Sequence, residues 1–131
     1  MSATHHLGWR DWADGVSEAI DYAIADIDQS QARHAKEPLK CALECATGMA
    51  YATAAEGAHD RTRRLVTSII WSIDAALTLQ KVLNDGPRDI APDMDDRHAM
   101  TSAIPALLRH ALISLDEYTS AMARHDKGHS R

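Results

Sequence analysis

The chain has 131 residues, a formal net charge of −5, 45% hydrophobic residues and 25% charged residues. This length suffices for one domain with its own core, and the composition is typical of a folded globular protein rather than a disordered one. The acidic balance argues against a nonspecific nucleic-acid binder, which is usually basic. No apolar run approaches the ~20 residues of a membrane-spanning helix, and the first residues have no apolar signal core, so we expect a soluble cytoplasmic protein without a membrane partner.

The two cysteines agree with a cytoplasmic location. Cys41 and Cys45 lie four residues apart on one predicted helix, where a disulfide between them would have poor geometry. We therefore expect two reduced thiols, as in a reducing compartment. Arginine outnumbers lysine and alanine is abundant, which suggests a GC-rich bacterial source.

Apolar periodicity predicts helices along the whole chain and no strands. The first helix should run from about Trp9 to about Arg33, with an acidic side and one apolar stripe. That stripe repeats every four and then three residues, which is the spacing of a helix packed lengthwise against others. Its members are Trp9, Ala13, Val16, Ile20, Ala23 and Ile27.

Two further helices are expected over residues 38–56 and 60–83. Pro38 suits the first turn of a helix, where its missing N–H costs nothing. Gly57 is a plausible helix end, and Asp60 is a plausible cap for the helix that follows. Because the joint between these helices is short, they should be antiparallel neighbours.

The last helix should begin after Pro92, near Asp93, and carry a stripe with the same four-three spacing. Pro105 should interrupt it, so we expect a short helical piece before Ser102 and then a kink or a restart. Four long helices with mostly short joints predict an all-α fold, an antiparallel four-helix bundle with up-down-up-down topology. We expect one domain over residues 1–131, with residues 1–7 and 125–131 flexible.

The second and third helices each have a second apolar stripe, and this is the main functional signal in the sequence. One stripe suffices for the surface helix of a monomer, so a second stripe indicates a second partner. Small residues in the second helix would let another helix approach closely, and Trp71 could anchor an interface. The candidate partner-binding residues are Cys45, Gly48, Ala52, Ala55, Trp71, Ala75 and Val82. The partner would be a second copy in a twofold homodimer or another protein target; alternatively, the last helix covers this surface within one chain.

A metal site is the second hypothesis. Cys41, Cys45 and Met49 are spaced i, i+4, i+8 and offer soft sulfur ligands for Cu(I) or Zn(II). The spacing resembles the CxxxC element of four-helix copper-storage proteins, and the resemblance implies a metal-binding bundle with Cu or Zn as its cofactor. Otherwise no cofactor is expected, and the cysteines act as small buried residues. The topology would also gather His59, His125 and other histidines at one end of the bundle, where three could meet a metal.

Arg61, Arg63 and Arg64 begin the third helix and form a candidate anion site, because arginines beside a helix N-terminus suit phosphate. Ion pairing with the acidic first helix and with Asp60 is the competing interpretation, and we favour it. No nucleophile, Walker or dinucleotide-binding motif occurs in the sequence, and no catalytic residue is assigned. The leading hypothesis is therefore a non-enzymatic helical interaction module: an inhibitor, regulator or assembly protein. A metal-binding bundle and a small helical enzyme with its site between subunits remain as alternatives.

Overall fold

The computed structural model describes residues 8–28, 32–85 and 94–129. Over this part of the chain the elements are α1 (Trp9–Asp28), the short 3₁₀ helix η2 (Ala32–Ala35), α2 (Lys36–Ala55), α3 (Asp60–Asp85) and α4 (Met94–His129). No strand occurs among these residues, so the all-α prediction is confirmed.

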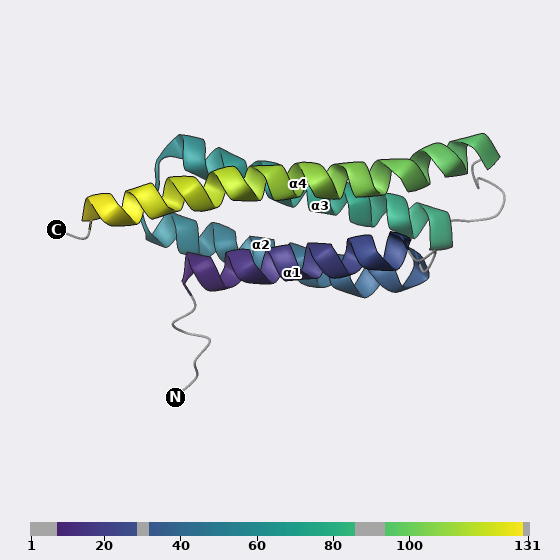
Figure 1. The fold of residues 1–131 in the computed structure, drawn as a ribbon, viewed down its shortest axis with the longest axis horizontal. Helices are drawn as coiled ribbons and strands as arrows, with labels where there is room; N and C mark the ends of the chain where they lie inside the picture. The colour runs from purple at the N-terminus through teal and green to yellow at the C-terminus, as the bar shows by residue number, and fades with distance from the viewer. Residues whose placement is uncertain (1–7, 29–31, 86–93, 130–131) are drawn as a thin grey trace, which may run out of the picture.

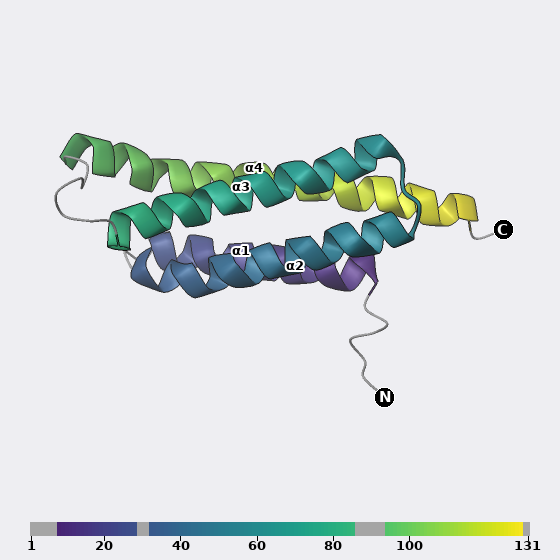
Figure 2. The same ribbon diagram turned by 180° about the vertical axis from the view of Figure 1, so that it is seen from behind.

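The four α-helices form two layers of two, with α1 beside α2 and α3 beside α4 (Figures 1 and 2). Successive helices run in opposite directions, and each contacts two neighbours, α1 with α2 and α4, and α3 with α2 and α4. Within the described residues, the backbones of α1 and α3, and those of α2 and α4, do not approach each other closely, so these pairs are the diagonals of the bundle. The predicted antiparallel up-down-up-down bundle is therefore confirmed.

The joint between α2 and α3 follows from its residues. The N–H of Glu56 donates to the carbonyl of Ala52 and that of Gly57 to the carbonyl of Ala54, which closes the last turn of α2. Gly57 adopts φ +69°, a left-handed conformation that glycine reaches without the cost a side chain imposes. Asp60 then begins α3, and its carboxylate accepts a hydrogen bond from the guanidinium of Arg63. Gly57 therefore terminates α2, as predicted.

The ends of the outer helices differ from the prediction. α1 ends at Asp28, before the expected Arg33, and η2 follows at Ala32. α4 reaches His129, so residues 125–129, which we expected to be flexible, belong to the helix.

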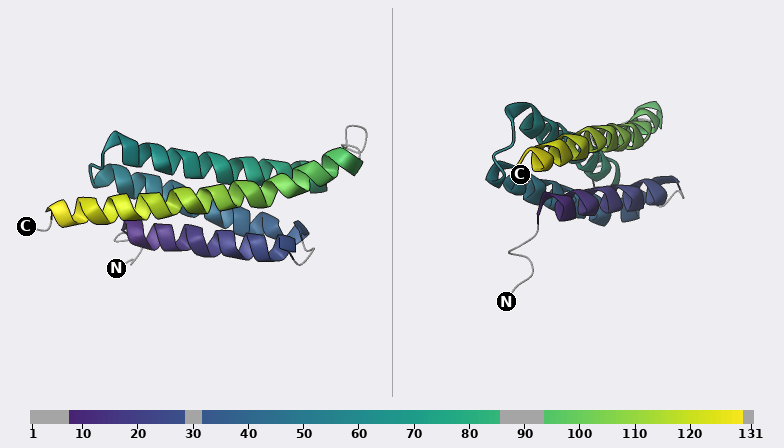
Figure 3. Two further views of the ribbon diagram at one scale, coloured as in Figure 1. Left: turned by 45° about the horizontal axis from the view of Figure 1, so that its top comes forward. Right: turned by 60° about the vertical axis from the view of Figure 1, so that its left-hand side comes forward.

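Of the kink or restart predicted near Pro105, the restart does not occur, because α4 is one continuous helix with Pro105 inside it. Figure 3 shows a single ribbon that curves along its length. Proline withholds one backbone hydrogen bond from a helix, but packing on both sides can hold the helix together. Ile104 and Leu108 flank Pro105 and are buried in the core at 1% and 0% exposure.

The core follows the predicted main stripes of all four helices. Its largest fully buried apolar side chains come from every helix: Ile20, Leu39, Met49, Ile69, Ile73, Ile104, Leu108, Tyr118 and Met122. The stripes alone therefore provide one continuous core, which leaves the second stripes of α2 and α3 to be explained separately.

α3 is more apolar than the sequence prediction allowed. Among the described residues it is the one helix, over Asp60–Asn84, that is long and apolar enough to cross a membrane by length and composition. A single such helix is weak evidence for a membrane span, because a mostly buried core helix of a soluble protein passes the same test; 39% of the apolar window of α3 is buried. Because one side of α3 is buried against α2 and α4 and Asp74 and Lys81 lie within the helix, its pattern is consistent with a soluble bundle.

Candidate functional site

The second stripe of α2 lies against α1. Gly48 faces the indole ring of Trp12, so close that a Cβ added at Gly48 would lie 2.6 Å from Cδ2 of Trp12. From the other side, a Cβ added at Gly15 would lie 2.9 Å from Sγ of Cys45. The two glycines therefore let α1 and α2 approach closely, with Trp12 lying on the α2 backbone.

This contact corrects one premise of the sequence prediction. Cys45, Gly48 and Ala52 are each half-buried, and for this stripe the second partner is α1 of the same chain. Ala55 lies at the end of α2 and is exposed. The stripe of α2 therefore gives no reason to expect a partner outside the chain.

The second stripe of α3 is open. Trp71 is 75% exposed and Val82 is 40% exposed, and Ala75 and Thr78 between them are exposed as well. These four residues, Trp71, Ala75, Thr78 and Val82, are called the outer face of α3 below. They lie opposite the buried stripe of the same helix, and no element in the described part of the chain covers them.

A shallow groove of about 530 Å³ runs beside Trp71. Its lining comes almost entirely from α3, with one side chain of α4: Arg64, Thr67, Ser68, Trp71, Ser72, Ala75 and Leu107. The groove extends the outer face of α3 toward α4, mostly with small hydroxyl and apolar side chains and with Arg64 at one end. A bulky side chain of a docked helix could lie there beside the indole ring.

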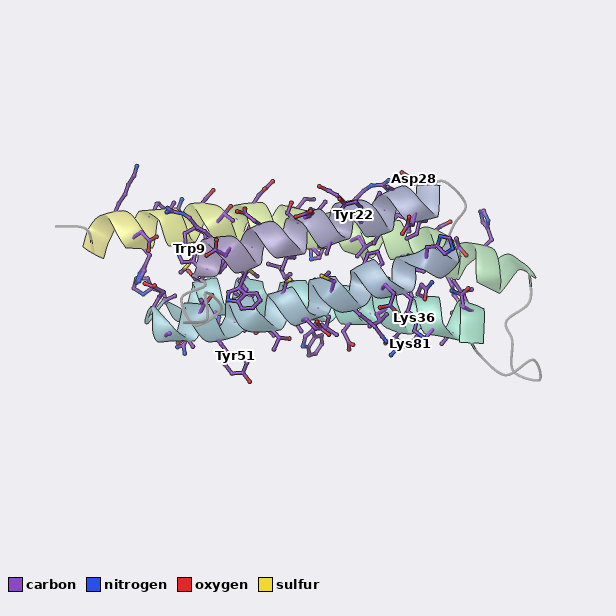
Figure 4. The ribbon with its side chains drawn as sticks, turned by 90° about the horizontal axis from the view of Figure 1, so that it is seen from below. Trp9, Tyr22, Asp28, Lys36, Tyr51 and Lys81 are labelled. Atoms are coloured by element: carbon purple, nitrogen blue, oxygen red, sulfur yellow. The ribbon has the colours of Figure 1, made fainter. Side chains whose placement is uncertain are left out.

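Charged side chains lie along one edge of the outer face. Asp74 and Lys81 are both exposed, and neither forms an ion pair with another described residue. Figure 4 shows Lys81 and Tyr51 at opposite ends of the edge formed by α2 and α3, Lys81 near Lys36 and Tyr51 toward the end that carries Trp9. Tyr51 belongs to α2 and is 76% exposed, which matches the exposure of Trp71.

The three arginines of the predicted anion site point to different places. Arg63 is paired with Asp60, as the competing interpretation proposed. Arg61 lines a groove between α3 and α4, and Arg64 lines the groove beside Trp71. The three side chains therefore do not converge on one anion.

The groove that contains Arg61 is larger, about 960 Å³, and has mixed charge. Its charged and histidine side chains come from the start of α3 and the end of α4: His59, Arg61, Asp116, Glu117, Arg124 and His125. We predicted that several histidines gather at this end of the bundle. Among the described residues this is confirmed for His59 and His125, whose ring centroids are 6.5 Å apart. His125 Nε2 also lies 3.0 Å from the carbonyl oxygen of Glu56. The described residues contain no group of three or more His, Cys, Asp or Glu side chains arranged to hold a metal.

Of the three sulfur residues of the predicted metal site, Cys41 and Cys45 lie close enough for their thiols to interact, whereas Met49 belongs to the core. Cys41 is exposed, Cys45 is half-buried near α1, and Met49 is fully buried in the core. Burial, followed by charge repulsion and a hydrogen bond from the neighbouring thiol of Cys41, raises the pKa of Cys45 to about 11. Cys45 is therefore a neutral thiol at physiological pH when no metal is bound.

One contact network at the end of the bundle has no counterpart in the sequence prediction. Trp9 Nε1 donates to Oδ2 of Asp126 over 3.1 Å, and Arg10 lies 3.7 Å from the same oxygen. The ring of Trp9 meets that of Tyr118 edge-on at 5.8 Å, and the buried hydroxyls of Tyr118 and Thr53 are 2.6 Å apart. The network joins α1, α2 and α4, so we assign it to the fold rather than to binding.

No protein-family model matches the chain, and no curated protein and no solved structure is significantly similar to it.

Proposed function

We propose that this chain is a non-enzymatic helical interaction module that associates with a second copy through the outer face of α3. One observation carries the proposal: Trp71 lies in the middle of α3 at 75% exposure, although the bundle has a complete core without it. Large exposed aromatic side chains are the residues that most often dominate binding energy when a partner buries them.

The energy available at this position is considerable. Burial of most of an exposed tryptophan side chain, on the order of 150 Å², contributes roughly 3–4 kcal/mol before the costs of association. Ala75 and Thr78 follow Trp71 on the same face and are short, so a partner helix could approach the α3 backbone. The outer face therefore combines one anchor with a surface that permits close packing.

A second copy is the simplest partner, because a twofold axis brings identical surfaces together. We also propose a cytoplasmic location, which the two free thiols support. The result would be a small homodimeric regulator or assembly protein, and a protein of different sequence would be the alternative partner.

Light scattering on a size-exclusion column tests this proposal with two matched variants. Trp71→Glu places a charge in the middle of the outer face, and Tyr51→Glu places the same charge at an equally exposed aromatic residue of α2. We expect a dimer for the wild type and for Tyr51→Glu, and a folded monomer for Trp71→Glu. A wild type that stays monomeric up to millimolar concentration would contradict self-association. A Trp71→Glu variant that remains dimeric would contradict the assignment to α3.

A further inference from the structure

We propose that the two copies meet through antiparallel α3 helices in one register, with Asp74 of each copy facing Lys81 of the other. This inference rests on the proposed function and adds the residues that determine how the copies align. Three features of the outer face support this alignment: the spacing, the size and the charge of its side chains.

The spacing of the outer face is that of a two-helix contact. Trp71, Ala75, Thr78 and Val82 repeat every four, three and four residues, which keeps one stripe facing a partner helix over its length. In an antiparallel pair of helices with a seven-residue repeat, residues at the first position of the repeat, a, face residues at its fourth position, d. Ala75 and Val82 occupy a positions, and Trp71 and Thr78 occupy d positions.

The sizes of these residues favour one alignment. If Ala75 faces Thr78 of the second copy, then Trp71 faces Val82 of the second copy at each end of the contact. Short side chains then meet at the centre, where helix axes can approach to roughly 8 Å. Each large indole meets a smaller branched side chain, so both ends can pack without two tryptophans competing for the same space.

The charges select the same alignment. Asp74 and Lys81 come directly before Ala75 and Val82, so they lie along the same edge of the outer face. In the proposed register Asp74 lies across from Lys81 of the second copy, and the twofold axis repeats the contact. Both side chains are exposed and make no ion pair with another described residue, so they are available for it.

The neighbouring registers bring like charges together. A shift of one repeat in one direction places Asp74 opposite Asp74 of the second copy and sets Arg64 against Val82. A shift in the other direction places Lys81 opposite Lys81 and removes Trp71 from the helix contact. A parallel alignment would set Trp71 against itself and leave Asp74 opposite Leu79. Like-charge repulsion therefore disfavours both shifted antiparallel registers, and the parallel one lacks charge pairs.

Charge reversal tests the register while leaving Trp71 in place. Asp74→Lys and Lys81→Asp should each weaken the dimer about tenfold, a loss of ~1.4 kcal/mol, because each turns two attractions into repulsions. The double variant Asp74→Lys with Lys81→Asp restores both attractions in the proposed register and should return to within about threefold of the wild type. An equimolar mixture of the two single variants should likewise associate more tightly than either variant alone. Asp14→Lys, at an exposed position of α1, is the control and should leave the dimer unchanged.

Sedimentation equilibrium of these variants tests the antiparallel register separately from the assignment of the dimer contact to α3. A double variant that stays as weak as the single variants would overturn the register, because the shifted alignments predict no rescue. If Trp71→Glu is monomeric in the same experiment, the proposed function survives that result. If Trp71→Glu is dimeric, both the register and the α3 site are wrong.

Discussion

The second apolar stripes of α2 and α3 have similar spacing in the sequence, but the stripe of α2 is covered by α1 and the stripe of α3 is exposed. The stripe of α2 consists of small residues, and α1 covers it with the ring of Trp12. The stripe of α3 carries its own tryptophan, and nothing in the described part of the chain covers it. The small residues of α2 leave room for a large side chain of a neighbouring helix. The exposed ring of α3 is instead a large side chain that a partner could bury.

The two tryptophans give the largest expected difference. Trp12→Ala removes a ring that packs on α2, and we expect the free energy of unfolding of the monomer to fall by roughly 2–4 kcal/mol. Trp71→Ala removes a side chain that the monomer leaves exposed, so the corresponding change should stay within about 0.5 kcal/mol.

Urea unfolding of both variants and the wild type, at protein concentrations too low for dimers, measures these changes. Equal losses for Trp12→Ala and Trp71→Ala would show that the two stripes do not differ in the way the structure indicates.

Two glycines on either side of the α1–α2 contact sharpen the comparison. Gly48→Ala should lower the free energy of unfolding by about 1–3 kcal/mol, because its Cβ would overlap the rigid ring of Trp12. Gly15→Ala meets only the Sγ of Cys45, and the ~1 kcal/mol gain in helix propensity should offset that cost. Thermal and urea unfolding of both variants measures the difference, and a Gly48→Ala protein as stable as the wild type would mean that α1 does not lie so close.

The two cysteines give the smallest effect, which depends on pH. At pH 8 iodoacetamide should alkylate the exposed Cys41 quickly and Cys45 slowly, because burial raises the pKa of Cys45 to about 11. The rate at Cys45 should rise as the pH approaches that value. Since the folded-state pKa is raised above the ordinary thiol value of 9.0, the associated stability is present below pH 9.0 and is lost as the pH rises toward about 11.

Mass spectrometry of peptides after timed alkylation separates the two sites, and urea unfolding between pH 8 and 11 follows the stability. Equal rates at Cys41 and Cys45 at pH 8 would place Cys45 outside the α1–α2 contact.

The sequence was sufficient for the architecture because each helix carries one stripe with regular spacing. The stripes of Ile20, Leu39, Ile73 and Leu108 all became core, and the order of the helices followed from the short joints. The continuity of α4 through Pro105 was not predictable from local rules, because it depends on the burial of Ile104 and Leu108 by other helices.

The site was predicted only in part, for a physical reason. Spacing shows that a helix has two apolar sides, but it does not show which neighbour covers the second side. Trp12 was the available signal for α2: a large ring beside the main stripe of α1 needs a recess, and Gly48 provides one. Asp126 gave no such signal, since it binds Trp9 and Arg10 from a part of the chain that we expected to be flexible.

Hydroxyl-radical footprinting of the wild-type protein over a range of concentrations tests the central claim most directly. Trp71 and Tyr51 have nearly equal exposure in the single chain, at 75% and 76%, while Trp12 is half-buried. We predict that oxidation of Trp71 falls several-fold as the concentration rises, while Tyr51 keeps its reactivity and Trp12 reacts weakly throughout. Oxidation of Trp71 that stays constant beside that of Tyr51 at every concentration would contradict a second copy on the outer face of α3.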